Sequence, residues 1–163
     1  MFTFVARDLS KKIAIVQNYL NSSNKSHYRT LQSMMSYEIE NGTVHMKGAH
    51  ASATRTMLRL HWALEFFIEF MDRLRHTPVD AKASSLVYEV YQGTLALHHP
   101  WWTRKLAYLA VFTLPSIKAL IDIMCKQDYE EVQLLLAEVV NTSRPILKYT
   151  ADLYKEHDLS NIH

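Results

Sequence analysis

The stretch SATRTMLRLHWALEFFIEFMDRLRH, from Ser52 to His76, decides the fold class. Apolar side chains recur through it at intervals of three and four residues, which is the period of an amphipathic α-helix. No glycine or proline interrupts it. The sequence therefore predicts one long helix with an apolar face and a charged face.

The segments before this helix are also predicted to be helical. A first helix is expected from about Phe4 to Leu20, where a run of asparagine and serine ends it. A second periodic segment covers residues 27–41 and stops at Gly42, a residue typical of helix C-termini. The stretch 42–51 between this segment and the long helix is expected to be a loop.

The segments after the long helix carry several helix start signals. Thr77 is predicted to be the N-cap of a fourth helix, with Pro78 as its first helical residue and an end near His98. Pro100 is predicted to open a short fifth helix, and residues 113–115 mark another start.

A final long helix is predicted near the end of the chain. Asp128 and Glu131 have the spacing of a capping box, and Pro145 should kink or divide the helix that follows. The 163 residues include only three glycines and four prolines, which is little material for a turn-rich β fold. We therefore expect one all-α domain over residues 1–163, with seven or eight helices in layers around an apolar interior.

Composition and motifs exclude several classes of function. A net charge of +2 is too small to indicate a nucleic-acid-binding protein. The longest nearly apolar stretch, residues 106–115, is too short to span a bilayer. There is no glycine-rich phosphate loop, no HExxH motif and no serine or cysteine nucleophile signature. We expect a monomeric, non-enzymatic protein without a metal ion or cofactor.

The charged positions of the long helix indicate a possible anion site. Arg55 and Arg59 lie one turn apart, and Trp62, Phe66 and Phe70 continue their stripe. Two arginines at this spacing repel each other, but an anion between them reverses that effect, and forked guanidinium donors match phosphate oxygens. The alternative is that each arginine pairs with a carboxylate from a neighbouring helix, and the spacing alone favours this alternative.

The first predicted helix repeats this order of polar and apolar residues. Asp8 and Lys12 come first on one stripe, and Ile15 and Tyr19 follow. Taken alone, Asp8 and Lys12 fit an ordinary surface ion pair worth about 0.3–0.5 kcal/mol. Two helices with the same polarity favour a shared amphiphilic ligand, with a polar headgroup at one end and apolar tails at the other.

The segment from His98 to Lys105 is the other unusual feature. His99 lies at a helix boundary, where its ring can either donate a hydrogen bond to a ligand carbonyl or cap the helix. Adjacent Trp101 and Trp102 face different directions on a helix, so one is expected to be buried and the other exposed. An exposed tryptophan near Arg104 and Lys105 suits a membrane interface. The alternative is that both rings lie in the core.

Five segments of the chain resemble the glycolipid transfer protein superfamily, and within it the ceramide-1-phosphate transfer proteins. The matching segments lie at similar spacings almost end to end: Phe4–Lys12, Tyr28–Met35, Arg55–His61, His99–Trp101 and Leu153–His157. The resemblance implies a two-layer helical sandwich that encloses the chains of a sphingolipid between its layers.

The resemblance also implies roles for individual residues. Asp8 would accept hydrogen bonds from the ceramide amide N–H and a nearby hydroxyl, and His99 would donate to the amide carbonyl. The phosphate would be held by Lys12, Arg55 and Arg59. The membrane surface would be contacted by Trp101, Trp102, Arg104 and Lys105. The apolar pocket is expected to be lined by Phe4, Ile15, Met35, Trp62 and Phe66.

The sequence differs from the family pattern at one end and from its glycolipid-selective members at one position. Family members carry a long helix before the segment that begins here at Phe2, and the resemblance implies that this chain lacks it, which would expose apolar surface. Glycolipid-selective members carry a tryptophan, on which a sugar can stack, where this chain has Arg59. Arginine there favours a phosphate headgroup.

These expectations combine into one predicted function with alternatives. We expect non-enzymatic transfer of ceramide 1-phosphate between membranes, by a cytosolic protein that contacts intracellular membranes and the inner face of the plasma membrane. One alternative is a lipid sensor that binds the same ligand without efficient transfer. Another is transfer of neutral glycolipids.

Overall fold

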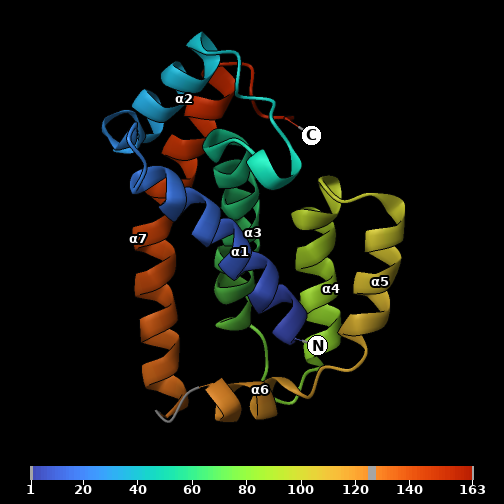
Figure 1. Ribbon diagram of the computed structural model, residues 1–163. Coiled ribbons are helices and arrows are strands. Elements are labelled where there is room, and N and C mark those ends of the chain that lie inside the picture. Colours follow the sequence, from blue (N-terminus) through green and yellow to red (C-terminus); the bar gives the residue numbers. More distant parts are fainter. Residues whose placement is uncertain (1, 125–127, 163) are drawn as a thin grey trace. The chain divides into compact units, whose positions relative to one another are not determined.

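The computed structural model describes residues 2–124 and 128–162 of the chain, and within these ranges it contains helices, turns and no β-strand. The all-α prediction is confirmed (Figure 1). The α-helices of this part of the chain are α1 (Phe2–Leu20), α2 (Leu31–Glu40), α3 (Ala53–Leu74), α4 (Ala83–Gly93), α5 (Trp101–Val111), α6 (Ile117–Met124) and α7 (Tyr129–Glu156). Short 3-10 helices cover Lys25–Tyr28, Gly48–His50 and Leu95–Leu97.

The chain divides into two compact units. The first unit comprises Met1–His61 and Lys148–His163, and the second comprises Trp62–Leu147. Each is described by itself below. Helices α3 and α7 contribute one part to each unit, whereas α1 and α2 belong to the first unit and α4, α5 and α6 to the second.

Aromatic side chains hold the first unit together. Tyr28, in the 3-10 helix after α1, stacks on Tyr19 of α1 with ring centroids 4.7 Å apart. Its ring also meets Tyr37 of α2 edge-on at 5.8 Å. On α7, the buried Tyr154 donates a hydrogen bond to the carbonyl oxygen of Thr54 at 2.7 Å. These contacts fix α1, α2 and the end of α7 around the start of α3.

A buried carboxylate closes the N-terminus of α3. Glu38 of α2 is 1% exposed, and its two carboxylate oxygens accept hydrogen bonds from the backbone N–H groups of Ala53 at 2.8 Å and Thr54 at 2.9 Å. The first N–H groups of a helix lack partners within the helix, and the helix dipole favours negative charge there. Glu38 therefore fixes where α3 begins.

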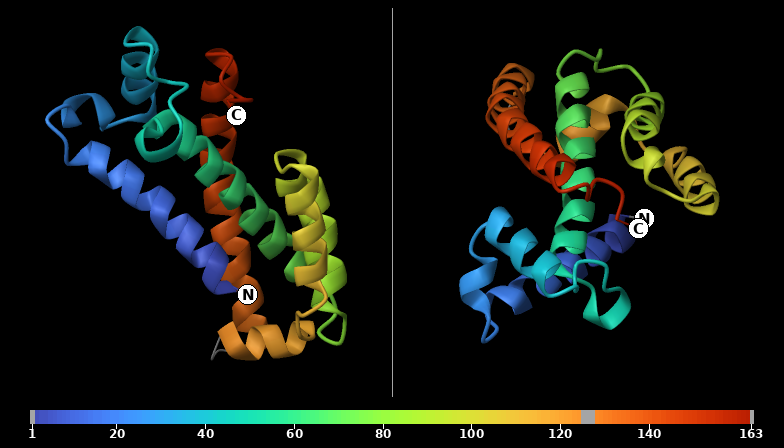
Figure 2. Two further views of the ribbon diagram at one scale, coloured as in Figure 1. Left: turned by 45° about the vertical axis from the view of Figure 1, so that its right-hand side comes forward. Right: turned by 90° about the horizontal axis from the view of Figure 1, so that it is seen from above.

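The second unit has its own apolar core. In Figures 1 and 2, α4 and α5 lie side by side while α6 runs across the unit. The segment before α4 is tied to the start of α6, because Lys118 N–H donates to the carbonyl oxygen of Val79 at 2.9 Å. The core residues come from α3, α4, α6 and α7: Phe70, Leu74, Ala83, Leu86, Val90, Ile117, Leu120, Ile121 and Val132.

Two predicted boundaries are wrong for local hydrogen-bonding reasons. The segment 27–41 is not one helix, because Thr30 starts α2 anew with a capping box in which its side chain accepts from the N–H of Ser33. Thr77 does not cap the fourth helix either. Its hydroxyl donates to the carbonyl oxygen of Arg73 at 2.8 Å and so closes the C-terminal end of α3. Helix α4 begins at Ala83 instead.

The predicted start of the last helix is confirmed, but its division is not. The N–H of Glu131 donates to the Asp128 carboxylate at 2.9 Å, as the capping-box spacing predicted. Helix α7 then runs from Tyr129 to Glu156 with Pro145 inside it. A proline removes one hydrogen bond from the backbone ladder, and here the helix is continuous despite that loss.

Candidate functional site

Arg55 and Arg59 lie half-buried one turn apart in the first part of α3, directly after the end that Glu38 caps. Arg59 Nη1 donates to the carbonyl oxygen of Arg55 at 3.3 Å. The Nε of Arg55 is buried and has no hydrogen-bond partner within the described ranges. A buried donor without an acceptor is costly, and an acceptor from outside the chain would remove that cost.

The electrostatic environment of the two arginines agrees with this geometry. Burial lowers the pKa of the Arg55 guanidinium. Burial also lowers the pKa of Arg59, and the positive charge of Arg55 lowers it further, whereas the Asp8 carboxylate acts in the opposite direction. An anion bound beside both guanidinium groups would therefore favour their charged forms.

The ion pairs that the spacing alone favoured are absent from the described part of the first unit. Neither arginine has a carboxylate oxygen within 4.0 Å there. By contrast, three arginines of the second unit form ion pairs. Arg73 pairs with Glu69 and Glu89. Arg75 and Arg144 both pair with Asp72. Among the described residues, Arg55 and Arg59 are thus half-buried arginines without an acidic partner.

Asp8 and Lys12 form the predicted ion pair along α1. The Asp8 side chain is 53% exposed and that of Lys12 is 20% exposed, so water screens the pair and its contribution to stability is small. The Asp8 carboxylate also acts to raise the pKa of Arg59, so the charges of these two side chains interact within the first unit. That Lys12, Arg55 and Arg59 hold one ligand together stays a prediction.

His99 belongs to the second unit, in the segment that leads into α5. Its Nδ1 lies 3.0 Å from the hydroxyl oxygen of Tyr91, on α4. Its carbonyl oxygen accepts a hydrogen bond from Arg104 Nε at 2.9 Å. The neighbouring His98 stacks on Trp62 with ring centroids 3.9 Å apart and planes 2° from parallel. That His99 acts on the same ligand as the arginines stays a prediction.

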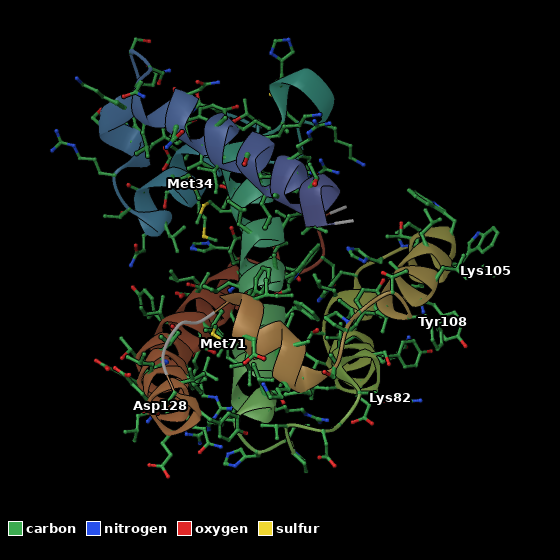
Figure 3. The ribbon with its side chains drawn as sticks, turned by 90° about the horizontal axis from the view of Figure 1, so that it is seen from below. Met34, Met71, Lys82, Lys105, Tyr108 and Asp128 are labelled. Atoms are coloured by element: carbon green, nitrogen blue, oxygen red, sulfur yellow. The ribbon has the colours of Figure 1, made fainter. Side chains whose placement is uncertain are left out.

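Both tryptophans of α5 are exposed, Trp101 by 66% and Trp102 by 56%, so the expectation that one is buried is wrong. The alternative with both rings in the core is also wrong. Exposed apolar and basic side chains lie on α5 and on Phe112, which directly follows it. We call this set the α5 surface: Trp101, Trp102, Leu106, Leu109, Phe112, Arg104 and Lys105. Lys105 Nζ lies 4.9 Å from the centroid of the Trp101 ring, and Lys105 points away from the unit in Figure 3.

A surface of this kind combines apolar and basic side chains, as contact with an anionic lipid interface requires. The helices described in the structure include none with the length and apolar character needed to cross a bilayer.

The residues predicted to line an apolar pocket are divided between the units. Met35 is fully buried in the first unit, where Ile15 is half-buried. Trp62 is buried in the second unit, where Phe66 packs against the core. The side chain of Phe4 lies outside the described part of the structure. Their role as pocket lining stays a prediction.

Two residues that support the site were not found from the sequence. Glu38 caps α3 across a separation of 15 and 16 residues, so no local spacing reveals it. Tyr91 contacts His99 eight residues later, across the end of one helix and a 3-10 turn. A helical stripe of apolar residues on α4 includes Tyr91 but does not separate a hydrogen-bonding tyrosine from a core tyrosine.

A family model described as Glycolipid transfer protein matches residues 1–126. The chain is 38% identical over 162 residues to the ceramide-1-phosphate transfer protein of Danio rerio, a match that covers 98% of this chain and 77% of that protein. Its fold is similar to the crystal structure of mouse ceramide-1-phosphate transfer protein in its apo form, with a TM-score of 0.90, 35% identity, and 98% of this chain and 78% of that chain covered.

It is also similar to the crystal structure of human ceramide-1-phosphate transfer protein in complex with 12:0 ceramide-1-phosphate. Here the TM-score is 0.90 at 31% identity, with 98% of this chain and 78% of that chain covered. The chain therefore spans about three quarters of the length of the relatives that it matches.

Proposed function

Because the chain belongs to the glycolipid transfer protein family, we propose that it carries ceramide 1-phosphate between membranes without chemical change of the lipid. The observation that supports this most directly is the arginine pair of α3. Arg55 and Arg59 are half-buried, have no acidic partner in the described first unit, and include one buried donor without an acceptor. A phosphate monoester supplies negative charge and several acceptor oxygens at once.

The headgroup is held by charge-assisted hydrogen bonds in this proposal. Arg55 and Arg59 offer forked donors to the phosphate oxygens, and Lys12 adds a point charge from α1. Lys12 is already neutralised in part by Asp8. Binding of the phosphate therefore places Lys12 between two anionic groups, which keeps the charges of the loaded site close to balance.

The ceramide amide is recognised by a carboxylate and an imidazole. Asp8 has two acceptor oxygens, of which its contact with Lys12 uses only one. The other is available to the amide N–H or a hydroxyl of the lipid backbone. His99 donates to the amide carbonyl from the segment before α5. Both groups recognise features common to sphingolipids, whereas the arginines distinguish the phosphate headgroup.

Membrane contact is made by the α5 surface. Its tryptophan rings enter the interface between headgroups and acyl chains, and Arg104 and Lys105 contact anionic headgroups. The chain then works as a cytosolic carrier that binds transiently to intracellular membranes and the inner face of the plasma membrane.

Lipid binding by the purified protein tests the proposal. Phosphatidylcholine vesicles that contain ceramide 1-phosphate are mixed with the protein, and native mass spectrometry records any bound lipid. We expect one ceramide 1-phosphate per chain with the wild type and a large loss with Arg55→Gln. Arg29→Gln, at an exposed arginine of the same unit, is the control and should bind normally. Equal binding by both variants would contradict the proposed role of the arginine pair.

A further inference from the structure

We infer that Tyr91 is a positioning residue that holds the proton of the His99 imidazole on Nε2, the tautomer in which this ring donates to a sphingolipid amide carbonyl. The inference rests on the proposed function, which assigns His99 to that carbonyl. In this inference Tyr91, on α4, does not bind the lipid. It sets the tautomer of His99, which does.

The geometry of the Tyr91 hydroxyl carries the argument. Tyr91 is 5% exposed, and its hydroxyl oxygen lies 3.0 Å from Nδ1 of His99. Most buried side-chain polar groups have a hydrogen-bond partner, and a buried phenol proton without an acceptor is costly. Among the described residues, His99 Nδ1 is the only acceptor within reach of this hydroxyl. The Tyr91 O–H therefore donates, and Nδ1 accepts.

The direction of this hydrogen bond decides the tautomer. A neutral imidazole carries one proton, and the nitrogen that accepts a hydrogen bond is the one without it. With Nδ1 as acceptor, the proton lies on Nε2, which is then a donor. The opposite arrangement would make Nδ1 the donor to the phenol oxygen and leave the buried Tyr91 proton without an acceptor.

The protonation of Tyr91 supports the same direction. Burial raises the pKa of its hydroxyl above the ordinary tyrosine value, while the nearby positive charge of Arg104 acts in the opposite direction. The net effect is a raised pKa, so the group is a neutral phenol and has a proton to donate. A phenolate would instead accept from Nδ1 and reverse the tautomer.

Two further contacts hold the backbone around His99 without using Tyr91. Arg104 Nε donates to the His99 carbonyl oxygen at 2.9 Å, and His98 stacks on Trp62. Neither contact involves Tyr91, so we expect both to remain when Tyr91 is replaced by phenylalanine. The substitution therefore removes the hydroxyl that orients the ring while the chain around it keeps its restraints.

Histidine tautomers are observable directly by long-range 1H–15N correlation spectroscopy. In the wild type, at a pH where the ring is neutral, we expect His99 to show a protonated Nε2 and an unprotonated Nδ1. Tyr91→Phe should give a mixture of the two tautomers. Tyr88→Phe makes the same chemical change on the same helix, at a tyrosine that contacts Tyr108 through its ring, and should leave the His99 signals unchanged.

Affinity for ceramide 1-phosphate in phosphatidylcholine vesicles is measured for the same three proteins. Loss of one oriented hydrogen bond should weaken binding about fivefold in Tyr91→Phe, with no change in Tyr88→Phe. A merely structural role for Tyr91 would change binding without changing the His99 tautomer.

The inference is overturned if wild-type His99 carries its proton on Nδ1, a result that stands even if Tyr91→Phe fails to fold. It is also overturned if Tyr91→Phe leaves either the tautomer or the affinity as in the wild type. Failure of the wild type to take up ceramide 1-phosphate would instead refute the proposed function, whatever the tautomer.

Discussion

Oε1 of Glu38 accepts a hydrogen bond from the backbone N–H of Ala53 at 2.8 Å, so a side chain of α2 fixes the first turn of the helix that carries Arg55 and Arg59. The second oxygen of the same carboxylate binds the N–H of Thr54. The residue at which α3 starts therefore depends on a buried acid of α2.

Replacement of Glu38 by alanine should destabilise the protein by about 2–4 kcal/mol, because two helix N–H groups and the Tyr28 hydroxyl lose their acceptor in a buried place. Urea unfolding monitored by circular dichroism measures the change. Glu40→Ala, at an exposed position of the same helix, is the matched control and should change stability little. Equal effects of the two variants would contradict the capping role of Glu38.

Replacement of Arg59 by tryptophan should weaken ceramide 1-phosphate binding about tenfold, since a charge-assisted contact is lost. An indole at this position also gives a sugar a surface on which to stack, so binding of galactosylceramide should rise. Competition between the two lipids in vesicles measures both effects together. An unchanged preference for the phosphate lipid would refute the role given to Arg59.

Replacement of Asp8 by valine should weaken ceramide 1-phosphate and galactosylceramide binding to a similar degree, because both lipids contain the amide that Asp8 is proposed to recognise. Stability should change by less than about 1 kcal/mol, since the lost ion pair with Lys12 is solvent-exposed on one side. Binding isotherms for the two lipids decide the matter. A loss confined to the phosphate lipid would show that Asp8 acts on the headgroup site instead.

Replacement of both Trp101 and Trp102 by alanine should lower the affinity for phosphatidylcholine vesicles about tenfold without lowering stability, because both rings are exposed. Sedimentation with vesicles measures the bound fraction. Leu134→Ala, at an apolar residue of α7 that is 73% exposed, is the control. Were the control to lose as much affinity as the tryptophan variant, the α5 surface would not be the docking site.

The parts of the fold that were predictable depend on interactions between near neighbours in sequence. The ion pair of Asp8 with Lys12 and the cap of Asp128 on Glu131 span four and three residues, and both follow from helical spacing. Thr77 was assigned wrongly because a threonine before a proline can either start the next helix or end the previous one. Only the carbonyl oxygen of Arg73, one turn back, decides between them.

The candidate site was predictable in its charged residues but not in what surrounds them. Helical periodicity placed Arg55 and Arg59 on one stripe that aromatic residues continue, yet spacing could not show whether a carboxylate was near. Whether a carboxylate lies near the arginines depends on which residues pack around α3. The capping of α3 by Glu38 depends on the same packing, because Glu38 lies on α2. The exposure of both Trp101 and Trp102 likewise follows from how α5 packs in its unit rather than from the order of its residues.

The most direct test of the account is the rate at which the protein moves lipid between vesicles. Fluorescently labelled ceramide 1-phosphate or galactosylceramide is placed in donor vesicles of phosphatidylcholine, and its appearance in acceptor vesicles is followed with and without protein. The account predicts that the wild type accelerates transfer of ceramide 1-phosphate well above that of galactosylceramide. Equal rates for the two lipids, or no acceleration of either, would contradict it.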